Sequence, residues 1–104
     1  MRKTKVTFSA EKLAYSSELM RALAHPLRLK ILEFIDKHGQ IHVNKIYNTM
    51  GLEQSITSQH LRILRLAGVV HTERDGKFVI YSIDYTVVDR AQRAVKKFLT
   101  SSGF

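Results

Sequence analysis

The residues best suited to chemistry form a run of hydroxyl and amide side chains near the middle of the chain. The run, with the arginine that follows it, consists of Gln54, Ser55, Thr57, Ser58, Gln59 and Arg62. Glutamine can pair with adenine and arginine with guanine through two hydrogen bonds, and serine or threonine can bond a base or a phosphate. No acidic residue lies between Gln54 and Thr72, so nothing in this stretch repels phosphate. These residue types favour contact with a nucleic acid.

Patterns for catalysis and metal binding are weak. The chain has no glycine-rich phosphate loop, no G-x-S-x-G motif and no paired carboxylates in an apolar setting, which argues against an enzyme. Cysteine is absent, which excludes disulfides and thiolate metal ligands. His38 and His42 are four residues apart, but Gly39 between them argues against a shared helical face. We therefore expect no metal ion and no cofactor.

The net charge of +8 is concentrated at the two ends of the chain. Residues 1–10 contain three basic side chains and residues 90–104 contain four, with no acid in either segment. Residues 11–89 carry ten basic and nine acidic side chains. A polyanionic partner would explain the excess, but so would solvated charge at each terminus. Charge alone therefore does not establish binding to a nucleic acid.

Length and composition fit one small domain. A chain of 104 residues that is 44% apolar can build a single core. We expect a basic arm at residues 1–8, a folded domain at 9–100 and a tail at 101–104. No apolar run approaches the ~18 residues that span a bilayer, and no apolar stretch of a signal peptide follows the charged N-terminus. We expect a cytoplasmic protein without membrane contacts.

Apolar spacing predicts four helices in the first two thirds of the chain. The first covers residues 9–24. The second opens at Pro26, directly after a turn that contains His25, and a basic last turn and Gly39 end it. The third covers roughly residues 43–50. The fourth covers residues 54–66, with an apolar side formed by Ile56, Leu61, Ile63 and Leu64.

The hydrophobic period then changes from 3.6 to 2. Residues 69–74 and 77–83 read as strands, with His71 exposed on the first, and Asp75-Gly76 between them is typical of a type I′ hairpin turn. A last helix follows, with Asp84 as its cap. The order α-α-α-α-β-β-α is mostly helical with a small β-hairpin, and it predicts a winged helix-turn-helix fold.

In this order the third and fourth helices form a helix-turn-helix unit. Its turn passes through Gly51-Leu52, where glycine permits a positive φ. The second helix of such a unit lies in the major groove and reads base edges with its N-terminal residues. The hairpin tip, with Arg74 and Lys77, would contact phosphate or the minor groove. An ordinary solvated helix would also be polar, but the length of the polar half and the hairpin behind it favour DNA.

Three segments resemble ArsR-type winged-helix repressors. Residues 22–32, ALAHPLRLKIL, resemble the start of the family's second helix, and residues 55–70, SITSQHLRILRLAGVV, resemble its recognition-helix signature. DGK at 75–77 and YSI at 81–83 resemble its wing. The resemblance covers about residues 10–100. It implies a homodimer on a roughly palindromic operator and repression that an inducer relieves.

The resemblance also implies a dimer formed by the first and last helices, with recognition helices about one DNA turn, ~34 Å, apart. The apolar stripes on those two helices agree with this arrangement. The predicted dimer contacts are Leu13, Met20, Val87, Val88, Ala91, Val95 and Phe98.

Two metal sites known in that family are not matched. Where members that sense metal through thiolates carry a Cys-Val-Cys type motif, this chain has His42-Val43-Asn44. Of the Asp and His zinc ligands on the last helix only Asp84 is present, and a lysine is a poor zinc ligand. The other ligand places hold Thr86, Lys97 and Thr100. We therefore expect a regulator without these metal sensors; a small-molecule or protein effector stays open.

These observations predict a sequence-specific regulator of transcription that binds double-stranded DNA. The expected DNA contacts are the six residues of the polar run together with His60, Arg65, Arg74 and Lys77. His60 would either contact phosphate or hold its helix against neighbouring elements. The alternative is a winged-helix module for protein–protein contact, whose binding face would carry aromatic or aliphatic anchors.

Overall fold

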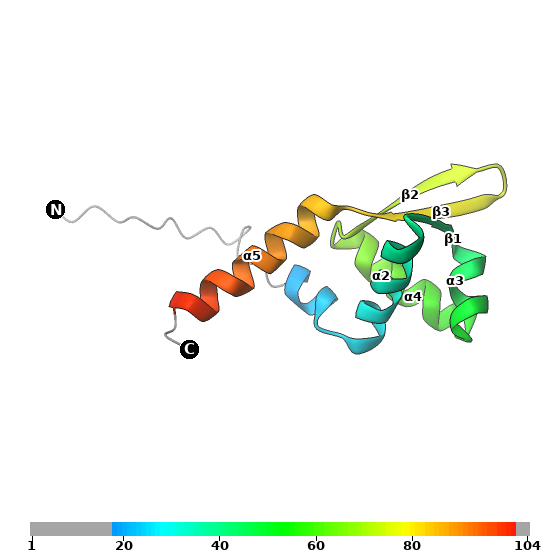
Figure 1. Cartoon of the computed structure of the whole chain (residues 1–104). Coiled ribbons are helices and arrows are strands. Elements are labelled where there is room, and N and C mark those ends of the chain that lie inside the picture. Colours follow the sequence, from blue (N-terminus) through cyan, green and yellow to red (C-terminus); the bar gives the residue numbers. More distant parts are fainter. Residues whose placement is uncertain (1–17, 102–104) are drawn as a thin grey trace.

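The computed structural model describes residues 18–101, and side chains through residue 96 (Figure 1). Residues 18–23 are helical and belong to the predicted first helix. The elements that follow are α2 (Pro26–His38), β1 (Gln40–His42), α3 (Val43–Met50), α4 (Gln54–Leu66), β2 (Val70–Asp75), β3 (Phe78–Ile83) and α5 (Tyr85–Ser101). The predicted basic arm at residues 1–8 and the predicted dimer residue Leu13 lie outside the described residues. No helix in residues 18–101 has the length and apolar character needed to cross a membrane.

The strands form one antiparallel sheet in the order β1-β3-β2. In β1, Ile41 pairs with Tyr81 of β3, and Val70 of β2 pairs with Ile83 of the same central strand. The sequence predicted β2 and β3 but not β1. Three residues are too short to show a period of 2, and β1 is extended because it pairs with β3, a strand some 40 residues further along the chain.

The hairpin turn lies one residue later than predicted. Asp75 pairs with Phe78, so the two loop residues are Gly76 and Lys77. Gly76 has φ +63°, whereas no residue other than glycine has a positive φ in the described part of the chain. A type I′ turn needs positive φ at both loop residues, so that prediction is wrong. Positive φ at the first loop residue alone fits a type II′ turn, which takes glycine there.

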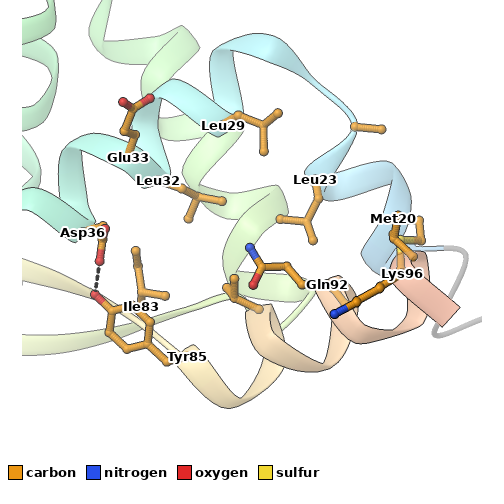
Figure 2. A pocket seen from close by; sticks show the side chains of 14 residues that line it. Met20, Leu23, Leu29, Leu32, Glu33, Asp36, Ile83, Tyr85, Gln92 and Lys96 are labelled. Atoms are coloured by element: carbon orange, nitrogen blue, oxygen red, sulfur yellow. Dashed lines mark hydrogen bonds between the residues drawn. The ribbon is translucent and has the colours of Figure 1, made fainter. Parts of the chain in front are cut away.

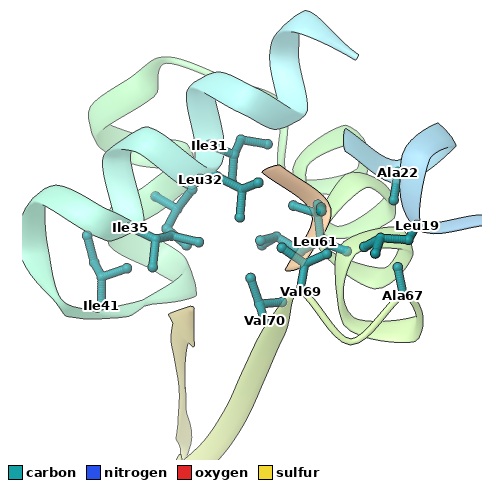
Figure 3. Packing of buried hydrophobic residues seen from close by; sticks show 13 residues of the cluster. Leu19, Ala22, Ile31, Leu32, Ile35, Ile41, Leu61, Ala67, Val69 and Val70 are labelled. Atoms are coloured by element: carbon teal, nitrogen blue, oxygen red, sulfur yellow. The ribbon is translucent and has the colours of Figure 1, made fainter. Parts of the chain in front are cut away.

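The core lies where α2, α3, α4 and the sheet meet, and Figure 3 shows part of it. Its largest fully buried hydrophobic side chains come from each of these elements: Ile31, Ile35, Ile46, Leu61, Leu64, Val69 and Val70. Burial of such side chains contributes about 1.5–3 kcal/mol each. This packing fixes α4 on its apolar side and leaves its opposite side in solvent.

Specific caps set the ends of the helices. His25 Nδ1 accepts a hydrogen bond from the Leu27 N–H at 3.2 Å directly before α2, which confirms that His25 belongs to the turn. At the start of α5, Asp84 Oδ1 accepts from the N–H groups of Thr86 and Val87, at 3.0 and 3.3 Å. The predicted cap is therefore confirmed. From this cap α5 runs away from the body of the molecule (Figure 1).

Candidate nucleic-acid interface

The turn of the helix-turn-helix unit starts at Gly51. This residue ends α3 in the left-handed conformation, with φ 65° and ψ 33°, and its N–H donates to the Tyr47 carbonyl. Only a few residues then separate α3 from α4. Any residue other than glycine would be strained at this φ. The turn therefore sets the angle at which α4 leaves α3.

One side of α4 is buried and the opposite side is exposed. Thr57, Leu61 and Leu64 have no exposed surface. Because successive residues are about 100° apart around a helix, Ser55, Gln59 and Arg62 point to the opposite side. Six predicted DNA contacts are exposed on this helix: Gln54, Ser55, Ser58, Gln59, Arg62 and Arg65. The structure thus gathers most of the predicted polar run on one accessible face.

Thr57 is a correction to the predicted DNA contacts. Its side chain is completely buried, and its hydroxyl donates to the Glu53 carbonyl at 2.8 Å. A hydroxyl that bonds the carbonyl four residues earlier is satisfied within its own helix and can face a core. Thr57 therefore packs α4 against the domain and does not reach DNA.

Ile56, in contrast to Thr57, was predicted to face the core but is exposed. The sequence placed it on the apolar side of α4, but it is 42% exposed beside Ser55 and Gln59. At about 100° from buried Thr57, its position lies outside the arc that the core covers. If Thr57 had been taken as a core residue, the helical spacing would have placed Ile56 outside the core. A hydroxyl side chain alone, however, does not indicate a buried position. An aliphatic group on this face can contact the methyl group of thymine.

His60 packs against the start of α2. Its Nδ1 accepts a hydrogen bond from Arg28 Nε at 3.2 Å, and its ring lies 4.7 Å from that of His25, centroid to centroid. Burial, and then the nearby His25 and Arg28, lower the pKa of His60. These contacts favour the second of its two predicted roles, in which it holds α4 against neighbouring elements.

The hairpin, or wing, carries the remaining predicted contacts at its tip. Arg74 and Lys77 are both exposed, and Lys77 Nζ lies 5.6 Å from the centre of the Phe78 ring. His42 also contacts the tip: its Nε2 lies 3.7 Å from Asp75 Oδ2 and its ring lies 4.9 Å from that of Phe78. Contacts from β1 therefore support the wing tip.

A second surface lies beside α5. An apolar groove of about 830 Å³ runs between the helical residues 18–23, α2 and α5 (Figure 2). Four predicted dimer residues line it: Met20, Val88, Ala91 and Val95. Val87 is partly buried elsewhere on α5, and the side chain of Phe98 lies outside those described. At the rim, the Tyr85 hydroxyl donates to Asp36 Oδ1.

The described residues of a single chain contain no cluster of metal ligands. No three His, Asp or Glu side chains in this part of the chain gather where they could hold an ion. Asp84, the single match to the last-helix ligands, already uses both carboxylate oxygens. One accepts the two cap hydrogen bonds, and Oδ2 lies 2.7 Å from His71 Nε2. The bond to His71, followed by those to the backbone, lowers the pKa of Asp84.

Comparison with known proteins identifies relatives that regulate transcription. An HTH-type transcriptional regulator of Mycobacterium tuberculosis is 43% identical over 67 residues, which are 64% of this chain but only 59% of the relative's length. The transcriptional repressor PagR of Bacillus anthracis is 37% identical over 87 residues, 79% of this chain and 87% of PagR. The crystal structure of PagR superposes with a TM-score of 0.64, covering 73% of this chain and 86% of PagR.

The fold itself has a further match. The structure of a homodimeric winged helix-turn-helix DNA-binding domain from Mycobacterium bovis superposes with a TM-score of 0.74 over 96% of this chain and 91% of that domain, at 24% identity. The fold is therefore the winged helix-turn-helix that the sequence predicted. Residues 25–72, which contain α2 and the whole helix-turn-helix unit, match the arsR family of bacterial regulatory proteins. With PagR matched over most of its length, the chain belongs to the ArsR family.

Proposed function

We propose that this chain is a sequence-specific transcriptional repressor that binds double-stranded DNA as a homodimer. The observation that carries the proposal is the exposed polar face on the N-terminal half of α4, in a helix-turn-helix unit followed by a wing. In this proposal Gln54, Ser55, Ser58 and Gln59 read base edges. Arg62, Arg65, Arg74 and Lys77 bind phosphate and fix the position of the protein on the duplex. That PagR is named a transcriptional repressor supports the proposed activity.

The apolar groove supports the homodimer. Val95 is 46% exposed and Tyr85 56% exposed on α5, and with Met20 and Leu23 they line one continuous surface. A second copy related by a two-fold axis would cover this surface with its own first and last helices. The same axis would place two copies of α4 about one DNA turn apart, which calls for a roughly palindromic operator.

We further propose that regulation uses neither a thiolate site nor the last-helix zinc site of the family. The chain has no cysteine, and both oxygens of Asp84 are engaged in the cap of α5 and the contact with His71. An inducer, if the protein has one, is then a small molecule or a protein.

Selection of DNA from a random library by the purified full chain, followed by footprinting, tests the proposed function. We expect a two-fold symmetric site whose half-sites lie about 10 base pairs apart, centre to centre. Affinity for the selected DNA should exceed that for scrambled DNA by about 10³-fold or more. Equal affinity for the two would contradict sequence-specific binding.

A protein-interaction module is the second candidate, because Ile56 and Leu66 are exposed on α4. Such a module would select no sequence from the library, and its binding face would depend on these two aliphatic side chains. The selection experiment therefore separates the two candidates directly.

A further inference from the structure

Arg28, near the start of α2, joins three parts of the domain through one side chain. Its Nη1 donates to the carbonyl oxygens of Arg21 and Ala22, at 3.0 and 3.3 Å, and its Nε donates to His60 Nδ1 at 3.2 Å. The two carbonyls lie near the end of the helical segment 18–23. The last carbonyls of a helix lack partners within the helix and carry its negative dipole end, so a guanidinium stabilises them.

The other end of this contact is the recognition helix. His60 follows exposed Gln59 and precedes buried Leu61, so it lies at the edge between the DNA-facing side of α4 and the core. Its ring also packs on His25, whose own Nδ1 caps α2. His60 therefore has two contacts with the start of α2, and both lie at the edge of the exposed face of α4.

We propose that Arg28 is a positioning residue for DNA recognition: it couples the end of the first helix to the recognition helix through His60. The proposal rests on the proposed function, because it takes α4 as the helix that reads DNA. Since the first helix is also a predicted dimer element, the Arg28–His60 link joins the dimer surface to the DNA-reading surface within one protomer.

The link depends on the protonation state of His60. A neutral imidazole offers Nδ1 as an acceptor when its proton is on Nε2, whereas an imidazolium has no acceptor. Protonation would therefore replace the acceptor by a donor that faces the Arg28 guanidinium. The titratable groups that face the ring are His25 and Arg28, and with burial they lower the pKa of His60. Acidification should open the link.

The two possible roles of His60 predict opposite changes of operator affinity with pH. If His60 held α4 through the Arg28 link, operator affinity would fall as pH is lowered from about 7.5 towards 5.5. If His60 instead bound phosphate, protonation would add a positive charge and affinity would rise. His60→Asn separates the two roles, because its carbonyl oxygen can accept from Arg28 and does not titrate in this range.

The test uses the full chain and the operator selected by the wild-type protein. We expect Arg28→Ala to weaken operator binding about ten-fold or more, the order expected when a charged hydrogen bond is lost. Lys30→Ala, an exposed position on the same helix, removes the same charge and should leave specific affinity nearly unchanged. Arg28→Lys should restore little affinity, because an ammonium cannot contact both carbonyls and His60 in the same geometry.

Salt dependence and pH profile decide the outcome. A positioning role leaves the slope of log affinity against log salt unchanged in Arg28→Ala, whereas a lost phosphate contact lowers it by about one. His60→Asn should retain neutral-pH affinity and lose the extra acid sensitivity of the wild type. Wild-type affinity in Arg28→Ala, a lowered salt slope, or the same acid loss in His60→Asn would each overturn the proposal.

Two further outcomes are separable. If the wild type selects no DNA sequence, the proposed function fails and not the Arg28 link alone. If Arg28→Ala does not fold, as circular dichroism would show, the comparison of wild type with His60→Asn across pH still decides the question.

Discussion

Gln59 occupies the middle of the exposed face of α4, on the opposite side from Thr57 and Leu61. Its amide can donate and accept at once, which suits the N6 and N7 edge of adenine. We expect Gln59→Ala to reduce operator affinity by about 1–3 kcal/mol and to leave affinity for random DNA unchanged. Titrations of both DNAs at one salt concentration measure the difference. An equal loss on both would mean that Gln59 does not read a base.

Ile56 carries a second prediction at the scale of single residues. If its exposed side chain contacts a thymine methyl group, replacing that thymine with uracil should weaken wild-type binding and have no effect on Ile56→Ala. A double-mutant cycle over operator positions measures this coupling. Leu66→Ala is the matched control, because Leu66 is 68% exposed at the other end of the same helix. If Ile56→Ala showed no coupling with any thymine replacement, Ile56 would not read a base.

At the scale of elements, the start of α5 depends on one carboxylate. Asp84 caps the helix and contacts His71 of β2, so it ties the last helix to the wing. Because its pKa is lowered in the folded state, its contribution to stability is present above the unfolded pKa, about 4. That contribution is lost as pH falls through the lower folded value.

We therefore expect Asp84→Asn to flatten the acid limb of the stability curve. Chemical unfolding of the wild type and of the variant between pH 3 and 7 measures this. Glu73→Gln, at an exposed position of β2, is the control for loss of one carboxylate. Parallel curves for wild type and Asp84→Asn below pH 4 would show that this carboxylate has the same pKa in both states.

The elements differ in how far the sequence determines them. The approximate bounds predicted for α3 and α4 agree with the structure, because Gly51 ends one helix and the apolar spacing of the next is regular. β1 was missed, since its extended form comes from pairing with β3 and not from its own three residues. The reversed burial of Thr57 and Ile56, relative to the prediction, has a similar origin. Which residues of α4 face the core depends on how the helix is rotated against α2, and hydrogen bonds within the helix can make a polar residue fit there.

At the scale of the whole molecule, the apolar groove along α5 is the proposed contact surface of the homodimer. Val95 is exposed on this surface in a single chain. A carboxylate buried without a partner in a dimer interface costs several kcal/mol, so Val95→Asp should dissociate the homodimer. Monomers should still fold, and operator affinity should fall because two half-sites are no longer bound together.

Analytical ultracentrifugation and operator titration of the same samples measure both effects. Thr86→Asp adds an equal charge to α5 about half a turn round the helix from Val95, where an acid near the N-terminus is tolerated. It should remain dimeric. A dimeric Val95→Asp would place the homodimer contact elsewhere.

The short strand β1 has a consequence for the layout of the DNA site. His42 is both the last residue of β1, paired to the wing strand β3, and the residue that directly precedes α3. The wing and the helix-turn-helix unit therefore share a backbone junction, which ties the position of one to that of the other. Where α4 meets its half-site, the wing must meet the flanking backbone at one set distance along the duplex. Protected flanks in every natural operator should then keep the same phase relative to the half-site, with no variable spacer between them.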